Sequence, residues 1–111
     1  MRNKFEKAGL NYDLILEKFP NINEYEETVN IYLDDPFFVE LKGYIEDEDY
    51  ALALDACKGL FILAQELYLY PLYIALLDVY EDLNEELYKE VMPHYNEMMN
   101  VHRKIKNIFS V

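Results

Sequence analysis

The segment from Asp49 to Glu66 constrains the fold most, because its apolar residues recur at α-helical spacing over its whole length. On a helical wheel, six residues of this region fall within one narrow arc: Ala53, Ala56, Cys57, Leu60, Ala64 and Leu67. Four of the six are alanine or cysteine. Small residues on a buried face let neighbouring helices approach closely, so this pattern predicts a tightly packed inner helix.

Other segments with helical spacing lie on both sides of this helix. We expect two short helices, Asn3 to Ala8 and Tyr12 to Lys18, a helix capped by Asn23 that stops at Asp34-Asp35, a helix capped by Asp35 with Pro36 at its first position, a helix from Pro71 to Tyr80, and a last helix capped by Asn84. Pro93 should kink or split the last helix.

These elements predict an all-α fold. The last four helices have the lengths and short connections of an antiparallel four-helix bundle, with the short N-terminal helices packed across one end. We expect no strands, and we expect residues 1–111 to form a single domain, since this length supports one hydrophobic core.

Composition narrows the classes of function. Apolar residues make up 52% of the chain, which excludes a disordered protein. The net charge of -12 makes nucleic acids and membrane surfaces poor partners. The longest apolar run, Leu67 to Leu77, contains Pro71 and is too short to span a bilayer. With a single cysteine and no apolar or arginine-rich leader, we expect a cytoplasmic protein. The basic group from His102 to Lys106 is interpreted as a favourable last helical turn.

A second arc of the central helix lies beside the core arc. It contains Leu54, Lys58, Phe61, Ile62 and Gln65. This arc is too broad to be buried entirely, because Asp55, Gly59 and Glu66 occupy the far side and must face water. We therefore expect the second arc to lie at the rim of the bundle, apolar but accessible to a partner.

The central helix resembles that of the histidine phosphotransfer (HPt) family, four-helix carriers that move a phosphoryl group in bacterial phosphorelays. The matching positions are Asp49-Tyr50, Ala53, Ala56-Cys57, Leu60, Ala64, Leu67, Leu69 and Leu72, without a gap. The flanks are also similar, at Gly9-Leu10-Asn11, Phe19, Glu24-Tyr25, Asp35-Pro36-Phe37 and Leu41. The resemblance covers roughly residues 3 to 108.

The chain departs from the family at the residues that carry the chemistry. Lys58 occupies the place of the phosphorylated histidine, Phe61 that of the lysine beside the phosphate, and Ile62 that of the following glycine. A phosphoacceptor needs a nucleophilic nitrogen, and a lysine ammonium has no lone pair to offer. The resemblance thus implies a degenerate member that has lost phosphotransfer.

Other candidate sites are weaker. His94 and His102 lie about 12 Å apart along one helix, too far to bind one metal ion together. His94 is interpreted as a solvated or capping side chain and His102 as a packing or rim residue, while Cys57 is interpreted as a small buried apolar residue. The sequence predicts no metal, no cofactor and no enzymatic activity.

The resemblance implies a phosphorelay partner, either the receiver domain of a response regulator or a histidine kinase. We expect Leu54, Phe61 and Ile62 to give apolar contact and Lys58 to face the acidic pocket of a receiver. Three alternatives stay open. In the first, the segment from Asn3 to Phe19 covers this surface and makes it part of the core. In the second, two copies of the chain meet through this surface, and in the third, His94 or His102 carries a phosphoryl group.

Overall fold

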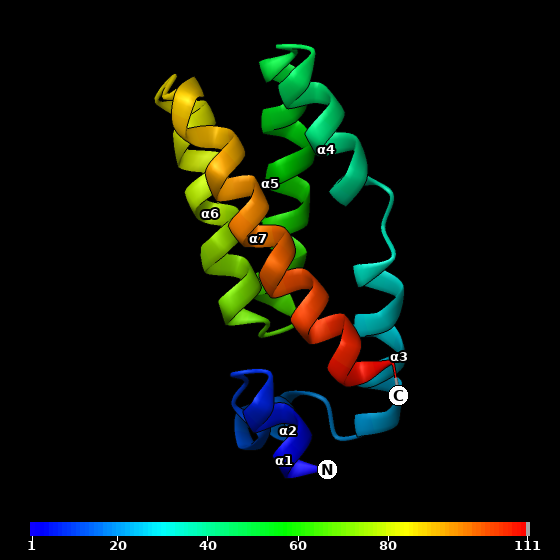
Figure 1. Cartoon of the computed structure of the whole chain (residues 1–111). Helices are drawn as coiled ribbons and strands as arrows, with labels where there is room; N and C mark the ends of the chain where they lie inside the picture. Colours follow the sequence, from blue (N-terminus) through cyan, green and yellow to red (C-terminus); the bar gives the residue numbers. More distant parts are fainter. Residues whose placement is uncertain (111) are drawn as a thin grey trace.

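The computed structural model describes residues 1–110, which are all helices and short connections (Figure 1). The helices are α1 (Arg2–Lys7), α2 (Tyr12–Lys18), α3 (Ile22–Leu33), α4 (Phe37–Glu46), α5 (Tyr50–Glu66), α6 (Tyr70–Asn84) and α7 (Tyr88–Phe109). No strand occurs in this described range. The predicted all-α class is therefore confirmed.

Helices α4, α5, α6 and α7 alternate in direction along the long axis of a body of 41 × 21 × 20 Å (Figure 1). Helix α5 packs against α4 and α6, and α7 packs against α6 and also contacts α4, α3 and α1. Helix α3 continues the line of α4 toward the end of the molecule where α1 and α2 lie (Figure 1). The order of packing leaves α5 with one flank toward α6 and the other toward α4 and α3.

The predicted core arc of α5 is buried. Ala53, Ala56, Cys57, Leu60, Ala64 and Leu67 each expose at most 8% of their surface. The Cys57 thiol donates a hydrogen bond to the carbonyl oxygen of Leu76 at 3.3 Å, and burial raises its pKa to about 12. Cys57 is thus a core residue, as predicted, and its thiol stays protonated at neutral pH.

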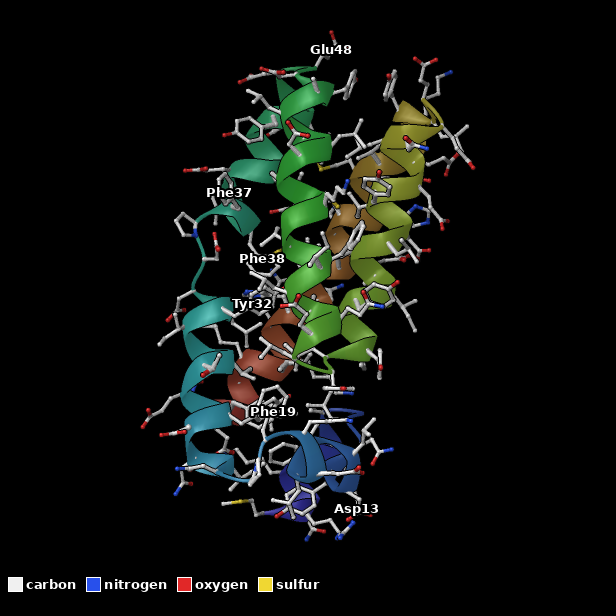
Figure 2. The ribbon with its side chains drawn as sticks, turned by 180° about the vertical axis from the view of Figure 1, so that it is seen from behind. Asp13, Phe19, Tyr32, Phe37, Phe38 and Glu48 are labelled. Atoms are coloured by element: carbon white, nitrogen blue, oxygen red, sulfur yellow. The ribbon has the colours of Figure 1, made fainter. Side chains whose placement is uncertain are left out.

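Long tyrosine side chains join α3 to α5. The Tyr25 hydroxyl donates to the carbonyl oxygen of Leu67 at 2.7 Å, and the Tyr32 hydroxyl donates to that of Leu60 at 2.6 Å. Figure 2 shows Tyr32 and Phe38 between α5 and the line formed by α3 and α4. Because whole tyrosine side chains span the gap, the two helices stand apart and leave space beside α5.

Several predicted helix ends are confirmed. The Asp49 carboxylate accepts from the Leu52 amide at 3.5 Å at the start of α5. At the start of α4 the Asp35 carboxylate accepts from the Phe37 amide at 2.8 Å, but Pro36 is the N-cap and the first helical residue is Phe37, one residue later than predicted. Helix α2 has its predicted bounds, and α3 ends at Leu33 before Asp34. The starts of α2 and α5 are capped by the side chains of Asn11 and Asp49, and such caps are visible in a sequence.

Two predicted helix starts are wrong. Asn21, and not Asn23, caps α3, since its side chain accepts from the Glu24 amide at 3.2 Å. Asn84 is the last residue of α6, and α7 begins only at Tyr88. Helix α6 is correspondingly longer than the predicted Pro71 to Tyr80.

Pro93 does not split α7, which is continuous from Tyr88 to Phe109. The missing amide hydrogen of Pro93 leaves only the carbonyl of Lys89 without a helical donor. Lys89 lies in the exposed first turn, where water can satisfy that carbonyl. A proline so close to the start of a long helix is therefore compatible with its continuation.

One turn geometry recurs where α1, α4, α5 and α6 end. The residues Gly9, Glu48, Tyr68 and Glu86 have φ angles of 76°, 58°, 57° and 59°. In each case the next amide donates back across the turn, as Leu87 does to the carbonyl oxygen of Asp82 at 2.8 Å. This is the Schellman geometry, which glycine favours because it has no Cβ. Three of the four positions carry a side chain and are strained.

We predict that Glu86→Gly raises the free energy of unfolding by about 1 kcal/mol, because the left-handed conformation no longer places a Cβ against the following carbonyl. Urea denaturation followed by circular dichroism measures the change. Glu85→Gly is the matched control, since Glu85 has a φ of -93°. It should lower stability by roughly 0.5–1 kcal/mol. Equal losses in both variants contradict the prediction.

Candidate docking surface

The predicted contact residues lie on the flank of α5 that faces α6. Lys58, Ile62 and Gln65 are exposed, whereas Leu54 and Phe61 are half-buried against the core. The ring of Phe61 packs edge-on against the rings of Tyr73 and Tyr80 in α6, with centroid distances of 6.0 and 5.0 Å. We call the five predicted residues the Lys58 surface. Its apolar base is held in place by α6, and its outer residues reach solvent.

The segment from Asn3 to Phe19 does not cover the Lys58 surface. Helices α1 and α2 lie at the end of the molecule, beside the last turn of α7 and the start of α3 (Figure 1). Phe5 packs edge-on against Phe109, and Phe19 packs against Tyr25 and Tyr68. Lys58, near the middle of α5, is exposed and forms no ion pair with any residue in positions 1–110.

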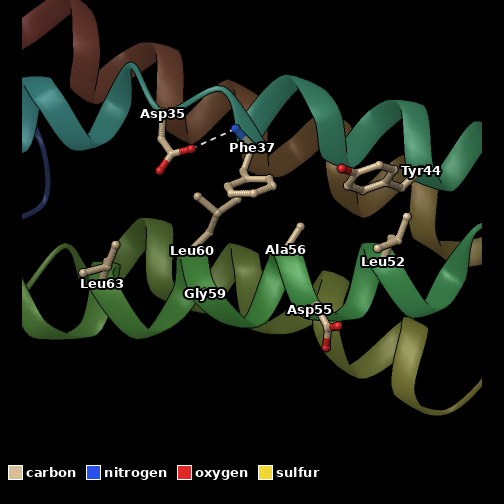
Figure 3. Close-up of a pocket in the computed structure, with 9 residues that line it drawn as sticks. All are labelled: Asp35, Phe37, Tyr44, Leu52, Asp55, Ala56, Gly59, Leu60 and Leu63. Carbon is tan, nitrogen blue, oxygen red and sulfur yellow. Dashed lines mark hydrogen bonds between the residues drawn. The ribbon is translucent and has the colours of Figure 1, made fainter.

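The opposite flank of α5 borders an apolar groove that the sequence analysis missed. A hollow of about 440 Å³ lies between α4 and α5 (Figure 3), lined by Asp35, Phe37, Tyr44, Leu52, Asp55, Ala56, Gly59, Leu60 and Leu63. A second, of about 600 Å³, is lined by Phe19, Thr28, Ile31, Tyr32, Asp34, Asp35, Pro36, Leu63, Glu66 and Leu67. Asp35 and Leu63 line both hollows, so the two adjoin. We call them together the α3–α5 groove.

One sequence signal for this groove existed. Leu52, Ala56, Gly59 and Leu63 recur at spacings of four, three and four, which places them on one side of a helix. Asp55 and Gly59 face water as predicted. These two residues lie beside exposed leucines on α5. The other residues of the groove come from α3 and α4 and are distant in sequence, so the pattern of α5 alone does not predict the groove.

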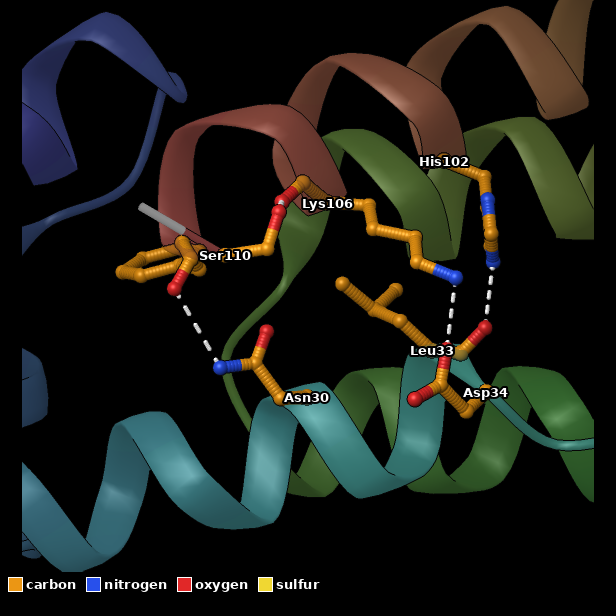
Figure 4. A network of polar contacts seen from close by, with 7 residues as sticks. Asn30, Leu33, Asp34, His102, Lys106 and Ser110 are labelled. Carbon is orange, nitrogen blue, oxygen red and sulfur yellow. Dashed lines mark hydrogen bonds and ion pairs between the residues drawn. The ribbon is translucent and has the colours of Figure 1, made fainter.

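His102 is a buried core residue and not a rim residue. Its Nε2 donates to the carbonyl oxygen of Leu33 at 2.7 Å (Figure 4), and its ring centroid lies 4.5 Å from that of Phe38. Burial lowers the pKa of His102, and the bond to Leu33 opposes this only partly. Below it, Lys106 forms an ion pair with Asp34 at 2.6 Å, so this basic residue joins the end of α7 to α3.

His94 is partly exposed, which agrees with its interpretation as a solvated side chain, but it also pairs with a buried carboxylate that the sequence did not predict. Its Nδ1 hydrogen-bonds to Asp82, which is only 6% exposed. That hydrogen bond raises the pKa of His94, with smaller contributions from the charges of Asp82, Asp78 and Glu97. The pair joins α6 to α7 across their connection, and the ring itself remains partly exposed.

Comparisons of the chain with protein-family models, with curated proteins and with solved structures found no match. The resemblance to HPt domains therefore depends on the residue pattern alone. In the described part of the chain, no group of three or more His, Cys, Asp or Glu residues could hold a metal ion. None of the helices found in residues 1–110 is long and apolar enough to cross a bilayer.

We predict that the His94–Asp82 pair makes stability depend on pH. The pKa of His94 is raised above 6.5, so the folded state binds more protons than the unfolded state between 6.5 and the raised value. The stabilisation is therefore complete below pH 6.5 and is lost as the pH rises through the raised pKa. Urea denaturation followed by tyrosine fluorescence should show a stability difference between wild type and His94→Gln that is larger at about pH 6 than at about pH 8.

His102→Gln is the matched control, because the pKa of His102 is lowered by burial. The contribution of His102 to the free energy of unfolding has the opposite pH dependence. It is present above pH 6.5 and is lost as the pH falls through the lowered pKa. A His94→Gln difference that is constant between about pH 6 and pH 8 contradicts the proposed pair.

Proposed function

We propose that this chain is a non-catalytic HPt-like docking module that binds a receiver domain through the Lys58 surface and carries no phosphoryl group. The observation that carries the proposal is the exposure of Lys58 near the middle of α5, at the position that the family pattern gives to the phosphoacceptor. The alternating helices α4 to α7 are compatible with the four-helix bundle of that family.

The chemistry of the Lys58 surface suits an acidic pocket. Lys58 offers a cation on a flexible stem, in a chain whose net charge is -12. Ile62, with 39% of its surface exposed, supplies apolar area next to it. Phe61 is fixed by two tyrosines of α6, so little side-chain freedom is lost there when a partner binds.

A homodimer through the same surface is less favourable. A two-fold axis at the Lys58 surface brings the two Lys58 cations close together, and it joins two chains that each carry a net charge of -12. Both effects oppose association, most strongly at low salt. Light scattering over a range of concentrations separates this alternative from a monomer that binds a receiver.

One observation favours a second candidate, an active phosphocarrier that uses His94. The bond from Nδ1 to Asp82 leaves Nε2 of a partly exposed ring free to act as a nucleophile in the neutral form. His102 lacks this property, because it is buried and its Nε2 is bonded to Leu33. The raised pKa of His94 works against the candidate, since it increases the protonated fraction.

We predict that Lys58→Glu and Ile62→Asp each weaken binding to a receiver domain by about tenfold or more, as removal of a contacting charge or insertion of a charge in an apolar contact does. Isothermal titration calorimetry against a set of receiver domains measures the change. Lys42→Glu and Val39→Asp are matched controls on exposed positions of α4, and they should leave the affinity unchanged. Equal affinity for wild type and Lys58→Glu rules out this surface.

We predict no acid-labile phosphoryl label on the chain after incubation with receivers charged by acetyl phosphate. A label on wild type that disappears in His94→Gln establishes the phosphocarrier instead. Phosphohistidine detection by mass spectrometry under neutral conditions provides the readout, with an HPt domain that has its histidine as the positive control.

A further inference from the structure

Several large apolar side chains that line the α3–α5 groove are exposed to solvent. Ile31, Phe37, Leu52 and Leu63 expose 75%, 45%, 46% and 43% of their surfaces. They come from three different helices and line one continuous depression. Apolar residues gathered in this way on a surface mark a contact with another molecule.

Every charged residue that lines the groove is acidic. These residues are Asp34, Asp35, Asp55 and Glu66. Asp34 is paired with Lys106 and Asp35 accepts a hydrogen bond from the Phe37 amide, but Asp55 and Glu66 form no ion pair with the residues described. The groove is thus an apolar floor with a negative rim, and it selects a ligand of the opposite pattern.

Gly59 lies between the two exposed leucines of α5. A Cβ added at Gly59 meets no atom within 4 Å, so packing inside the molecule does not require a glycine there. Glycine in the middle of a helix is unfavourable compared with alanine. At this place in the groove, however, the missing side chain lets the backbone of a bound segment approach α5 closely.

We propose that the α3–α5 groove binds an amphipathic helix of a partner protein, with an apolar face flanked by lysine or arginine. Along α5, Leu52 to Leu67 rises about 22 Å, which matches roughly four turns of a bound helix. Large apolar side chains of that helix fill the two hollows, and its basic flanks pair with Asp55 and Glu66. This is the helix-in-groove mode of recognition.

A second copy of this chain is a poor occupant. The exposed basic residues Arg103 and Lys104 belong to α7, whose apolar residues Met98, Ile105 and Phe109 are already buried in its own core. Binding of this apolar face in the groove of another copy requires α7 to detach from the core of its own chain. The charge of -12 on each chain opposes the contact further.

Fluorescence anisotropy with labelled peptides of about 18 residues tests the proposal. The first peptide is a leucine/lysine helix with leucine on one face. The second replaces each lysine by glutamate, and the third permutes the leucine/lysine sequence so that the leucines surround the helix. We expect the first to bind about tenfold or more tightly than either control. Equal binding of the permuted peptide reduces the interaction to nonspecific charge and overturns the proposal.

Two pairs of variants place the binding in the groove. Leu63→Asp and Gly59→Leu should each weaken the first peptide by about tenfold or more, whereas Ile74→Asp and Gly43→Leu should not. Ile74 is 58% exposed on α6, and Gly43 also has no atom within 4 Å of an added Cβ. Gly59→Leu adds a good helix former to open space, so thermal unfolding should show no loss of stability.

The peptide assay contains no receiver domain, so its outcome is separate from that of the proposed binding through the Lys58 surface. Equal peptide affinity for wild type, Leu63→Asp and Gly59→Leu overturns the groove as the site. A concentration-dependent dimer in light scattering that the peptide dissociates assigns the groove to a second copy, and it also overturns the proposal.

Discussion

Burial of the small-residue arc of α5 is the constraint on which the rest of the molecule depends. Ala53, Cys57 and Ala64 are fully buried, so α4 and α6 can pack closely on either side of α5. Because the small residues of α5 fill the contact with its neighbours, the large apolar residues on either side of this arc are not fully buried. Phe61 and Leu54 are therefore left half-buried beside α6, and Leu52 and Leu63 remain exposed beside α4 and α3.

The elements found from the sequence are those whose signals are local. The arc of α5 follows from spacing, and the cap Asp49 and the bond from the Phe37 amide to Asp35 follow from side-chain oxygens within three residues of their amides. The starts of α3 and α7 were misplaced for two reasons. Asn21 and Asn23 carry the same capping side chain, and Glu86 takes a left-handed conformation that sequence patterns assign to glycine. The strain at Glu48, Tyr68 and Glu86 is balanced by packing between helices, which no local pattern contains.

The candidate sites divide in the same way. The Lys58 surface belongs to one helix, so a wheel predicted its position beside the core arc. The α3–α5 groove needs Ile31 and Phe37 from two other helices, held at a distance from α5 by Tyr25 and Tyr32. The bonding partners of the histidines were not predicted, because each histidine bonds to another helix, His102 to Leu33 in α3 and His94 to Asp82 in α6. Such pairings depend on topology, which must be known first.

The two flanks of α5 differ in charge, and this difference limits what they can bind. The Lys58 surface presents a cation and suits an acidic pocket, whereas the α3–α5 groove presents Asp55 and Glu66 and suits a basic helix. The two surfaces meet along the exposed face of α5, where Asp55 and Lys58 lie three residues apart and Ile62 and Glu66 four, so a large partner on one restricts access to the other. A contact between the Lys58 surface of one copy and the groove of the next is heterologous, so it adds copies in a ring or an open chain. The net charge of -12 opposes such growth, which favours a monomer that binds other proteins over one that binds itself.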